Sequence, residues 1–220
     1  MKNTYLSCFF SVLLYLFFSL TSLAAEIDTV QIYSEAMKKE IPALIVTPEA
    51  YTEAEQNYPV IYLLHGYSDS YSGWTTKASV VPSLADRHEV IVVMPDGGYN
   101  SWYIDSPLDP DSQYETHVAE EVVAFVDENY RTLDSKSGRA ITGLSMGGHG
   151  GLFLGIRHQE TFGAAGSMSG GVDLTYDIHR WEIAEKLGPY SQNPERWDSL
   201  SVVNLVEDRK STRLNSSHYS

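Results

Sequence analysis

The stretch Gly143-Leu144-Ser145-Met146-Gly147 decides how this chain is expected to fold and where its chemistry lies. It follows the short β-type run 140–142 and precedes a segment, 146–158, whose composition favours a helix. A serine held at a sharp strand-to-helix turn needs neighbours with almost no side chain, and glycines two residues before and after it meet that need. The pattern therefore predicts that Ser145 is a nucleophile. The alternative is a glycine-rich turn with an incidental serine.

The segments on either side of this turn predict strands alternating with helices. Val60–Leu64 and Val90–Met94 are unbroken apolar runs, typical of strands covered on both faces. Glu115–Tyr130 has one apolar side, typical of a helix packed on a sheet. The alternation predicts an α/β fold, with a mainly parallel sheet and helices on both faces. The expected strands are 28–33, 41–46, 60–64, 90–94, 140–142 and 163–168, and the expected helices 75–88 (interrupted near Pro82), 115–130 and 146–158.

Residues 1–24 carry the pattern of a secretory signal peptide. Lys2 gives a basic start, residues 5–20 are apolar, and small residues precede the first acid. We expect cleavage after Ala24 and a secreted or periplasmic protein; an uncleaved membrane anchor is the alternative. Cys8 is the only cysteine and lies within this segment, so the mature chain is expected to have neither a disulfide nor a cysteine nucleophile.

The other end of the chain reads as an artefact. Asp208–His218 is the in-frame translation of a common sequencing-library adapter. We therefore expect one incomplete domain at 25–207, with 208–220 derived from the adapter and His218 without a function. Between Gly171 and Glu207 the sequence shows helical or loop patterns and no further strand, so the sheet looks unfinished.

The charge of the chain excludes two classes of partner. The formal net charge is −14, which repels phosphate backbones and anionic lipid. We expect no nucleic-acid partner and no membrane partner after signal cleavage. A small-molecule substrate remains, with a mild bias toward neutral compounds.

Two backbone N–H groups are expected to form an oxyanion hole, the pair of donors that stabilises the negative oxygen of a tetrahedral intermediate. Met146, directly after the serine, supplies one, and Tyr67, in the loop after the strand that ends in His65-Gly66, supplies the other. His65 is expected to be a structural loop residue, because the general base comes last in chain order in this type of fold. His149 is expected to pack beneath the turn.

Four aromatic residues fall in loops that leave the predicted strands and are candidates for a substrate pocket. The alternative is that they only cover the edge of the sheet. Asp69 and Asp105 could contact calcium or a sugar, but no metal-ligand spacing supports a metal, and no cofactor is expected. The four pocket candidates are Trp74, Tyr99, Trp102 and Tyr103.

Four motifs together resemble the putative-esterase family: residues 63–66 (Leu-Leu-His-Gly), 94–97 (Met-Pro-Asp-Gly), 101–103 (Ser-Trp-Tyr) and 143–148 (Gly-Leu-Ser-Met-Gly-Gly). That family includes S-formylglutathione hydrolases, tributyrin esterases, feruloyl and acetyl xylan esterases, and the antigen 85 mycolyltransferases. The resemblance runs from about Ile27 to Glu207 and implies an α/β-hydrolase fold whose C-terminal strands are missing here.

The resemblance also implies which catalytic residues this chain lacks. In the family the triad acid and histidine follow later strands, so both are expected to be absent from this chain. Asp173 is a weaker candidate for the acid, and His158 and His179 are expected at the surface. A triad lesion removes orders of magnitude in rate, so the truncated chain is expected to be weakly active or inactive.

The expected function of the parent protein is that of a secreted serine carboxylic-ester hydrolase. It would act on short-chain or carbohydrate-linked acyl esters through an acyl-Ser145 intermediate. S-formylglutathione is a less favoured substrate, because it is made inside cells. An acyltransferase of the same fold and a non-catalytic carbohydrate-binding relative remain alternatives. The sequence leaves the acyl group, the alcohol and the oligomeric state open.

Overall fold

The computed structural model describes residues 25–52 and 54–206. The predicted signal peptide at 1–24 and the adapter-like segment at 208–220 lie outside the described residues. Within the described part of the chain, no helix combines the length and the apolar character that crossing a bilayer requires.

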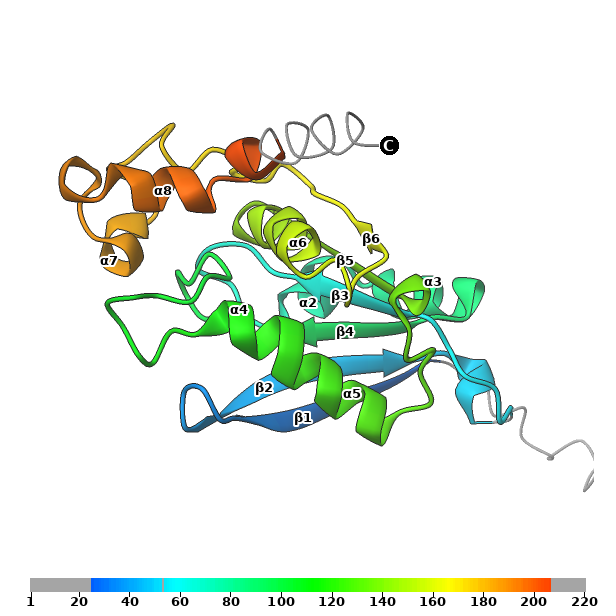
Figure 1. Cartoon of the computed structure of the whole chain (residues 1–220). Coiled ribbons are helices and arrows are strands. Elements are labelled where there is room, and N and C mark those ends of the chain that lie inside the picture. Colours follow the sequence, from blue (N-terminus) through cyan, green and yellow to red (C-terminus); the bar gives the residue numbers. More distant parts are fainter. Residues whose placement is uncertain (1–24, 53, 207–220) are drawn as a thin grey trace, which may run out of the picture.

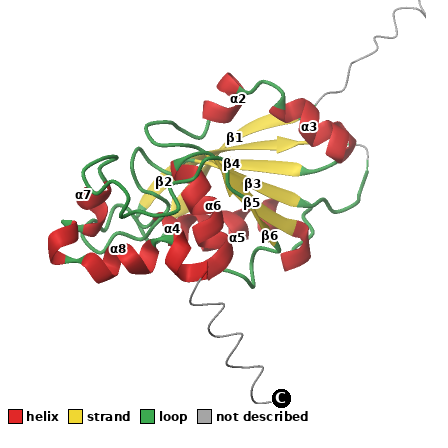
Figure 2. Ribbon diagram, turned by 90° about the horizontal axis from the view of Figure 1, so that it is seen from above, coloured by secondary structure: helices red, strands yellow, loops and turns green. Residues whose placement is uncertain are grey.

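Six strands form one mixed sheet in the order β1-β2-β4-β3-β5-β6 (Figures 1 and 2). β1 and β2 form an antiparallel hairpin, and β2 pairs antiparallel with β4. β3 pairs parallel with both β4 and β5, and β5 pairs parallel with β6. The parallel half therefore brings the carboxyl ends of β3, β4 and β5 to one edge, where the loops that carry the predicted site begin. The strands are β1 (Glu26–Ser34), β2 (Lys39–Thr47), β3 (Val60–Leu64), β4 (Ile91–Pro95), β5 (Arg139–Gly143) and β6 (Ala164–Ala165).

The helices follow the predicted segments with two differences. The segment expected at 75–88 forms two short helices, because Pro82 has no backbone N–H and is accommodated in the first turn of the second one. The segment expected at 115–130 contains a π-helical stretch, η2 (His117–Val122), between two α-helical pieces. The helices are α2 (Gly73–Lys77), α3 (Val81–His88), α4 (Tyr114–Thr116), α5 (Val123–Asn129), α6 (Met146–Arg157), α7 (Ile183–Leu187) and α8 (Pro194–Leu200); the 3₁₀ turns are η1 (Glu49–Tyr51), η3 (Lys136–Gly138) and η4 (Tyr190–Gln192).

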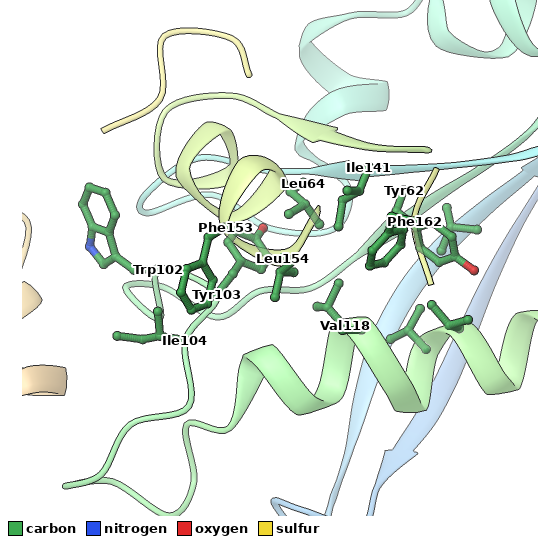
Figure 3. Packing of buried hydrophobic residues seen from close by; sticks show 14 of the residues in the cluster. Tyr62, Leu64, Trp102, Tyr103, Ile104, Val118, Ile141, Phe153, Leu154 and Phe162 are labelled. Carbon is green, nitrogen blue, oxygen red and sulfur yellow. The ribbon is translucent and has the colours of Figure 1, made fainter. Parts of the chain in front are cut away.

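Both faces of the sheet are covered, as β4 shows. Ile91 and Val93 belong to the large core beneath η2, α5 and α6 (Figure 3). Val92 and Met94 belong to a smaller cluster beneath α3. Because alternate residues of a strand point to opposite faces, an unbroken apolar run implies two buried faces. The predicted α/β fold with helices on both sides is confirmed.

The last strand is shorter than the sequence predicts. The pattern indicated residues 163–168, but β6 is Ala164–Ala165, with an isolated bridge between Leu144 and Met168. β6 forms an edge of the sheet, and both of its residues are exposed. A sequence pattern can indicate a strand, but the length of the strand also depends on the pairing that it makes, and β6 pairs with β5 alone.

The segment after β6 packs as helices at the carboxyl-edge end of the sheet (Figure 1). Leu187 of α7 and Trp197 of α8 are fully buried and join the large core. Trp197 Nε1 donates a hydrogen bond to the carbonyl of Gly188 at 2.9 Å, which ties α8 to the end of α7. Residues 202–206 are helical as well.

Candidate active site

Ser145 occupies a strained turn between β5 and α6. Its backbone angles are φ 56° and ψ −112°, a combination that L-residues rarely adopt. Two backbone hydrogen bonds hold the turn: Ser145 N donates to the Met168 carbonyl at 2.9 Å, and His149 N donates to the Ser145 carbonyl at 3.0 Å. Strain of this kind costs about 1–3 kcal/mol and persists where the surroundings enforce it. The Ser145 residue itself is exposed.

The two glycines around Ser145 are required by close backbone packing. A Cβ on Gly147 would lie 2.4 Å from the Leu64 carbonyl oxygen and 2.6 Å from that of His65. A Cβ on Gly143 would lie 2.5 Å from the Gly147 carbonyl oxygen and 2.6 Å from that of Leu64. The turn is therefore pressed against the carboxyl end of β3, and any side chain at either position would force these segments apart.

The loop after β3 lies beside the serine. A Cβ on Gly66 would sit 3.7 Å from the Ser145 Cβ, so the next residue, Tyr67, begins close to the hydroxyl-bearing side chain. Met146 is the first residue of α6, a helix of 12 residues whose free N–H groups give this end a partial positive charge. Among the described residues, the N–H groups of Tyr67 and Met146 have no hydrogen-bond partner. The structure thus brings together the three residues predicted for the nucleophile and the oxyanion hole.

His65 joins the ends of β3 and β4. Its Nε2 accepts a hydrogen bond from Gly97 N at 2.8 Å, so the proton of the neutral ring is on Nδ1, which lies 2.8 Å from the Gly66 carbonyl. Burial lowers the pKa of His65, which favours this neutral form. With both ring nitrogens engaged, His65 stabilises the two loops and is not available to Ser145 as a base.

His149 lies beneath the turn, fully buried, as predicted. Its ring stacks on Phe153 at 5.2 Å and an interplanar angle of 16°. Nδ1 lies 3.0 Å from the Trp102 carbonyl, and Nε2 lies 3.1 Å from the Leu200 carbonyl. Burial lowers the pKa of His149, so the ring is neutral and donates to one carbonyl at a time. His149 therefore connects the turn to the loop after β4 and to the end of α8.

Three further described residues were considered as a base or an acid, and none of them is hydrogen-bonded to Ser145. His158, at the end of α6, lies 3.0 Å from Glu115 Oε1 and is partly buried, whereas His179 is exposed. Asp173 is exposed, and its carboxylate accepts hydrogen bonds from the backbone N–H and hydroxyl of Thr175. Within residues 25–52 and 54–206, no histidine ring is hydrogen-bonded to the Ser145 hydroxyl.

Two of the predicted pocket aromatics, Tyr99 and Trp102, lie near the loop that contains Tyr67, together with Trp181, which the sequence did not predict. Tyr99 is 58% exposed, and its ring lies 5.0 Å from that of Tyr67. Trp181, which follows the last strand, lies 5.4 Å from the same Tyr67 ring, and its carbonyl accepts a hydrogen bond from Trp102 Nε1 at 3.2 Å. Trp181 was missed because its segment has no clear periodicity; a large aromatic in an unpatterned loop was the only signal.

The other two predicted pocket aromatics have structural positions. Tyr103 is fully buried, and its hydroxyl donates a hydrogen bond to the His65 carbonyl at 3.1 Å. Trp74 packs against the smaller cluster beneath α3, with its Nε1 donating to the Leu64 carbonyl at 3.1 Å. Both hold the carboxyl end of β3 in place.

The two aspartates considered as calcium or sugar contacts make local bonds. Asp69 forms an ion pair with Lys77 at 2.6 Å and accepts a hydrogen bond from Ser70 N. Asp105 accepts hydrogen bonds from the backbone N–H and the hydroxyl of Thr116 at the start of the α4–α5 segment. Both carboxylates therefore order the loops around the site.

A serine on a strained strand-to-helix turn, at the carboxyl edge of a largely parallel sheet covered on both faces, defines a fold of the α/β-hydrolase type. The family model described as "Putative esterase" matches residues 34–216. The chain belongs to this esterase family.

Several known proteins are similar to this chain. An esterase of Mycobacterium tuberculosis is 32% identical over 137 residues, which cover 61% of this chain and 30% of that protein. An acetyl esterase of Caldicellulosiruptor saccharolyticus is 29% identical over 140 residues, covering 60% of this chain and 52% of that protein. A solved ferulic acid esterase superposes with a TM-score of 0.72 and 27% identity, covering 86% of this chain and 75% of that one. The chain thus spans about half or less of the length of these two curated relatives.

Proposed function

We propose that the complete protein hydrolyses carboxylic esters, with Ser145 as the nucleophile. The Ser145 oxygen attacks the acyl carbonyl, the alcohol leaves with a proton, and water then hydrolyses the acyl-serine to release the acid. The N–H groups of Tyr67 and Met146 stabilise the oxyanion in both halves of the reaction; the loss of one such donor typically costs about 2.7–4 kcal/mol of transition-state stabilisation.

The observation that carries this proposal is the exposed Ser145 in its strained turn, with two unpaired N–H groups beside it. The surroundings enforce this strained backbone, because Gly143 and Gly147 let the turn press closely on the carboxyl end of β3. The same arrangement places α6 so that its N-terminus favours the negative charge that develops on the substrate.

We propose that the general base and its acid partner come from residues other than those described here. Both ring nitrogens of His65 and of His149, the described histidines near the site, lie within hydrogen-bond distance of backbone groups and not of Ser145. Without a base the serine remains protonated and attacks slowly, so residues 25–206 alone are expected to hydrolyse esters weakly or not at all.

The proposed substrates are short-chain or carbohydrate-linked acyl esters, and the proposed location is outside the cytoplasm. Relatives named acetyl esterase and ferulic acid esterase support the substrate class. The basic and apolar pattern of residues 1–24 supports export. The strongly negative net charge favours neutral esters over anionic ones.

The test is turnover of p-nitrophenyl acetate by the protein expressed from its full gene. Turnover that falls to background in Ser145→Ala, while Ser169→Ala retains it, supports the proposal. Absence of turnover above background would contradict it and favour a non-catalytic relative. Addition of a sugar acceptor, followed by product analysis, separates hydrolysis from acyl transfer.

A further inference from the structure

Left-handed backbone is concentrated in the loops that surround Ser145. Such a conformation is unfavourable for residues other than glycine, and it persists only where the surroundings enforce it. It occurs in the loop after β3, in the loop after β4 and in the segment that leads into α7. Beside the Ser145 turn, positive φ angles of 55° to 61° are found at Ser68, Trp102, Tyr103, Trp181 and Glu182. The surroundings must therefore hold these three segments firmly.

The side chain of Tyr67 packs against one aromatic ring from each of the two other segments. Its ring lies 5.0 Å from that of Tyr99, in the loop after β4, at an interplanar angle of 63°. It lies 5.4 Å from the ring of Trp181, before α7, at an interplanar angle of 73°. Both pairs have the edge-to-face geometry that aromatic rings favour. The residue that carries a proposed oxyanion donor is thus held through its side chain by two segments outside its own loop.

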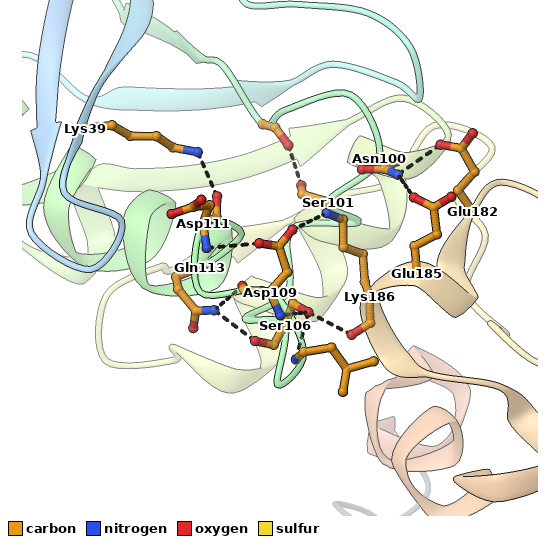
Figure 4. A network of polar contacts seen from close by, with 12 residues as sticks. Lys39, Asn100, Ser101, Ser106, Asp109, Asp111, Gln113, Glu182, Glu185 and Lys186 are labelled. Carbon is orange, nitrogen blue, oxygen red and sulfur yellow. Dashed lines mark hydrogen bonds and ion pairs between the residues drawn. The ribbon is translucent and has the colours of Figure 1, made fainter.

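A polar contact joins the same two segments (Figure 4). Asn100 Nδ2 donates hydrogen bonds to Glu182 Oε2 at 2.9 Å and to Glu185 Oε2 at 3.1 Å. The neutral amide group is thus shared by two carboxylates that would otherwise repel each other. Glu182 also acts on Tyr67: partial burial, then Tyr99 and Glu182, raise the pKa of the Tyr67 hydroxyl, so this hydroxyl remains a hydrogen-bond donor.

α7 gives this contact a fixed base. Leu187 of α7 is fully buried in the large core. Ser106 Oγ, in the loop after β4, donates a hydrogen bond to the Lys186 carbonyl at 2.8 Å. Trp102 Nε1 donates a hydrogen bond to the Trp181 carbonyl at 3.2 Å, which holds the backbone just before the helix. Residues 181 and 182 are therefore fixed relative to the loop after β4.

Both peptide groups that flank the Cα of Tyr67 are held as well. The Gly66 carbonyl, in the same peptide group as the Tyr67 N–H, lies 2.8 Å from His65 Nδ1. In the next peptide group, Ser68 N donates a hydrogen bond to the Tyr99 carbonyl at 2.9 Å. Because a peptide group is planar, these two bonds fix the direction of the Tyr67 N–H, which itself has no hydrogen-bond partner among the described residues.

We propose that Tyr99, Asn100, Trp181 and Glu182 position the Tyr67 N–H for the oxyanion, and we call these four residues the Tyr67 clamp. They are positioning residues, because they act through Tyr67 and not on the reacting atoms. The effect on catalysis rests on the proposed function, whereas the hold on the loop stands on the contacts alone. Removal of an oxyanion donor typically lowers kcat by about 10²–10³-fold, and a misplacement of about 1 Å can lower the rate by about 10²-fold. Loss of the clamp is therefore expected to lower kcat by about tenfold to a hundredfold.

The first measurement is hydrogen exchange at the Ser68 amide in the 15N-labelled protein expressed from its full gene. Asn100→Asp removes the shared donor and places a third carboxylate beside the two glutamates, so it opens the clamp. Exchange at Ser68 is expected to become at least about tenfold faster. Trp181→Ala is expected to have the same effect, whereas Trp181→Phe keeps a ring against Tyr67 and is expected to exchange like the parent protein.

The second measurement is p-nitrophenyl acetate turnover by the same proteins, with kcat and KM determined separately. Asn100→Asp is expected to lower kcat by about tenfold to a hundredfold and to leave KM within about threefold, because an oxyanion donor acts on the transition state and not on the bound ester. Addition of Glu182→Gln to this variant restores a donor and an acceptor with their places exchanged. The double variant is expected to regain at least about fivefold in kcat over Asn100→Asp. Glu182→Gln alone keeps an acceptor oxygen for Asn100 and is expected to behave like the parent.

Two controls separate a local effect from a general loss of stability. Asn129→Asp, at the end of α5, is the same substitution and removes a hydrogen bond of 2.8 Å from Asn129 Nδ2 to the Phe125 carbonyl. It is expected to leave both the Ser68 exchange and kcat unchanged. The Gly166 amide, which donates to the Ile141 carbonyl at 2.9 Å, is expected to exchange at the same rate in every variant.

Unchanged Ser68 exchange in both Asn100→Asp and Trp181→Ala would overturn the proposal, whether or not the protein hydrolyses esters. A rise in KM with an unchanged kcat would also overturn it, because these side chains would then contact the substrate instead. A protein that hydrolyses no ester but shows faster Ser68 exchange in the variants would overturn the proposed function and support the clamp. Ester hydrolysis that depends on Ser145 but is unaffected by these variants would do the reverse.

Discussion

Replacing Gly147 by alanine is expected to destabilise the folded chain, although alanine is the better helix former. Gly147 is the second residue of α6, where alanine alone would add up to about 1 kcal/mol of helix stability. The new methyl group would lie 2.4 Å from the Leu64 carbonyl oxygen, whereas real Cβ contacts are essentially never shorter than 3.0 Å. Either β3 or α6 must therefore move by at least 0.6 Å, the difference between these two distances.

The magnitude follows from two opposing contributions. Overpacking of a tight interior costs about 1–3 kcal/mol, and here the obstacle is backbone on both sides, which cannot rotate away. Because the backbone obstacle cannot rotate away, we take the upper part of this range, about 2–3 kcal/mol. Subtraction of a helix-propensity gain of about 1 kcal/mol leaves a net loss of about 1–2 kcal/mol, or a fall in melting temperature of about 2–8 °C for a domain of this size.

Thermal unfolding followed by circular dichroism measures this change. The matched control is Gly66→Ala, whose methyl group would make ordinary contacts of 3.4 Å with the Leu144 carbonyl oxygen and 3.7 Å with the Ser145 Cβ. We expect Gly66→Ala to leave the melting temperature nearly unchanged. A Gly147→Ala protein that melts at the same or a higher temperature than the parent would refute the claim that β3 holds the turn in its strained form.

Two further substitutions test the surroundings of the site. Burial alone would raise the pKa of Glu115, but hydrogen bonds from His158 and Arg157 outweigh burial and lower it, so Glu115 adds stability above pH ~4.5 that is lost as the pH falls through its folded-state pKa. In urea unfolding, Glu115→Gln should therefore be less stable than the parent at pH 7 and approach the parent's stability near pH 3. A difference in stability that stays constant with pH would contradict this assignment. His149→Phe keeps the stack on Phe153 but removes every donor to the Trp102 and Leu200 carbonyls, so it should lower the unfolding free energy by about 1–3 kcal/mol. His149→Gln restores a donor and should lower the unfolding free energy by less. A larger loss in His149→Gln than in His149→Phe would refute the claim that hydrogen bonds from His149 hold these two carbonyls.

Local patterns were sufficient to predict most of the fold. Val60–Leu64 has the same bounds in the sequence prediction and in the structure, because a short apolar run rich in β-branched residues and bounded by loop residues is typical of a strand covered on both faces. The turn at Ser145 was equally predictable, since its glycines express a local steric requirement. Each of these features is determined by neighbours in the sequence.

Features that depend on distant residues were less accessible to sequence reasoning. β6 was predicted too long, because strand length depends on pairing partners that a local pattern does not reveal. Trp181 joins Tyr67 only through the path of the chain after β6.

The most direct test of the central claim is to identify the residue that forms the covalent intermediate. The complete protein would be treated with a fluorophosphonate probe, digested, and mapped by mass spectrometry. We expect one adduct, on the peptide that contains Ser145, with ester hydrolysis lost in proportion to labelling and no adduct in Ser145→Ala. An active protein labelled at a different residue, or one that hydrolyses esters with Ser145 unmodified and replaceable, would contradict it.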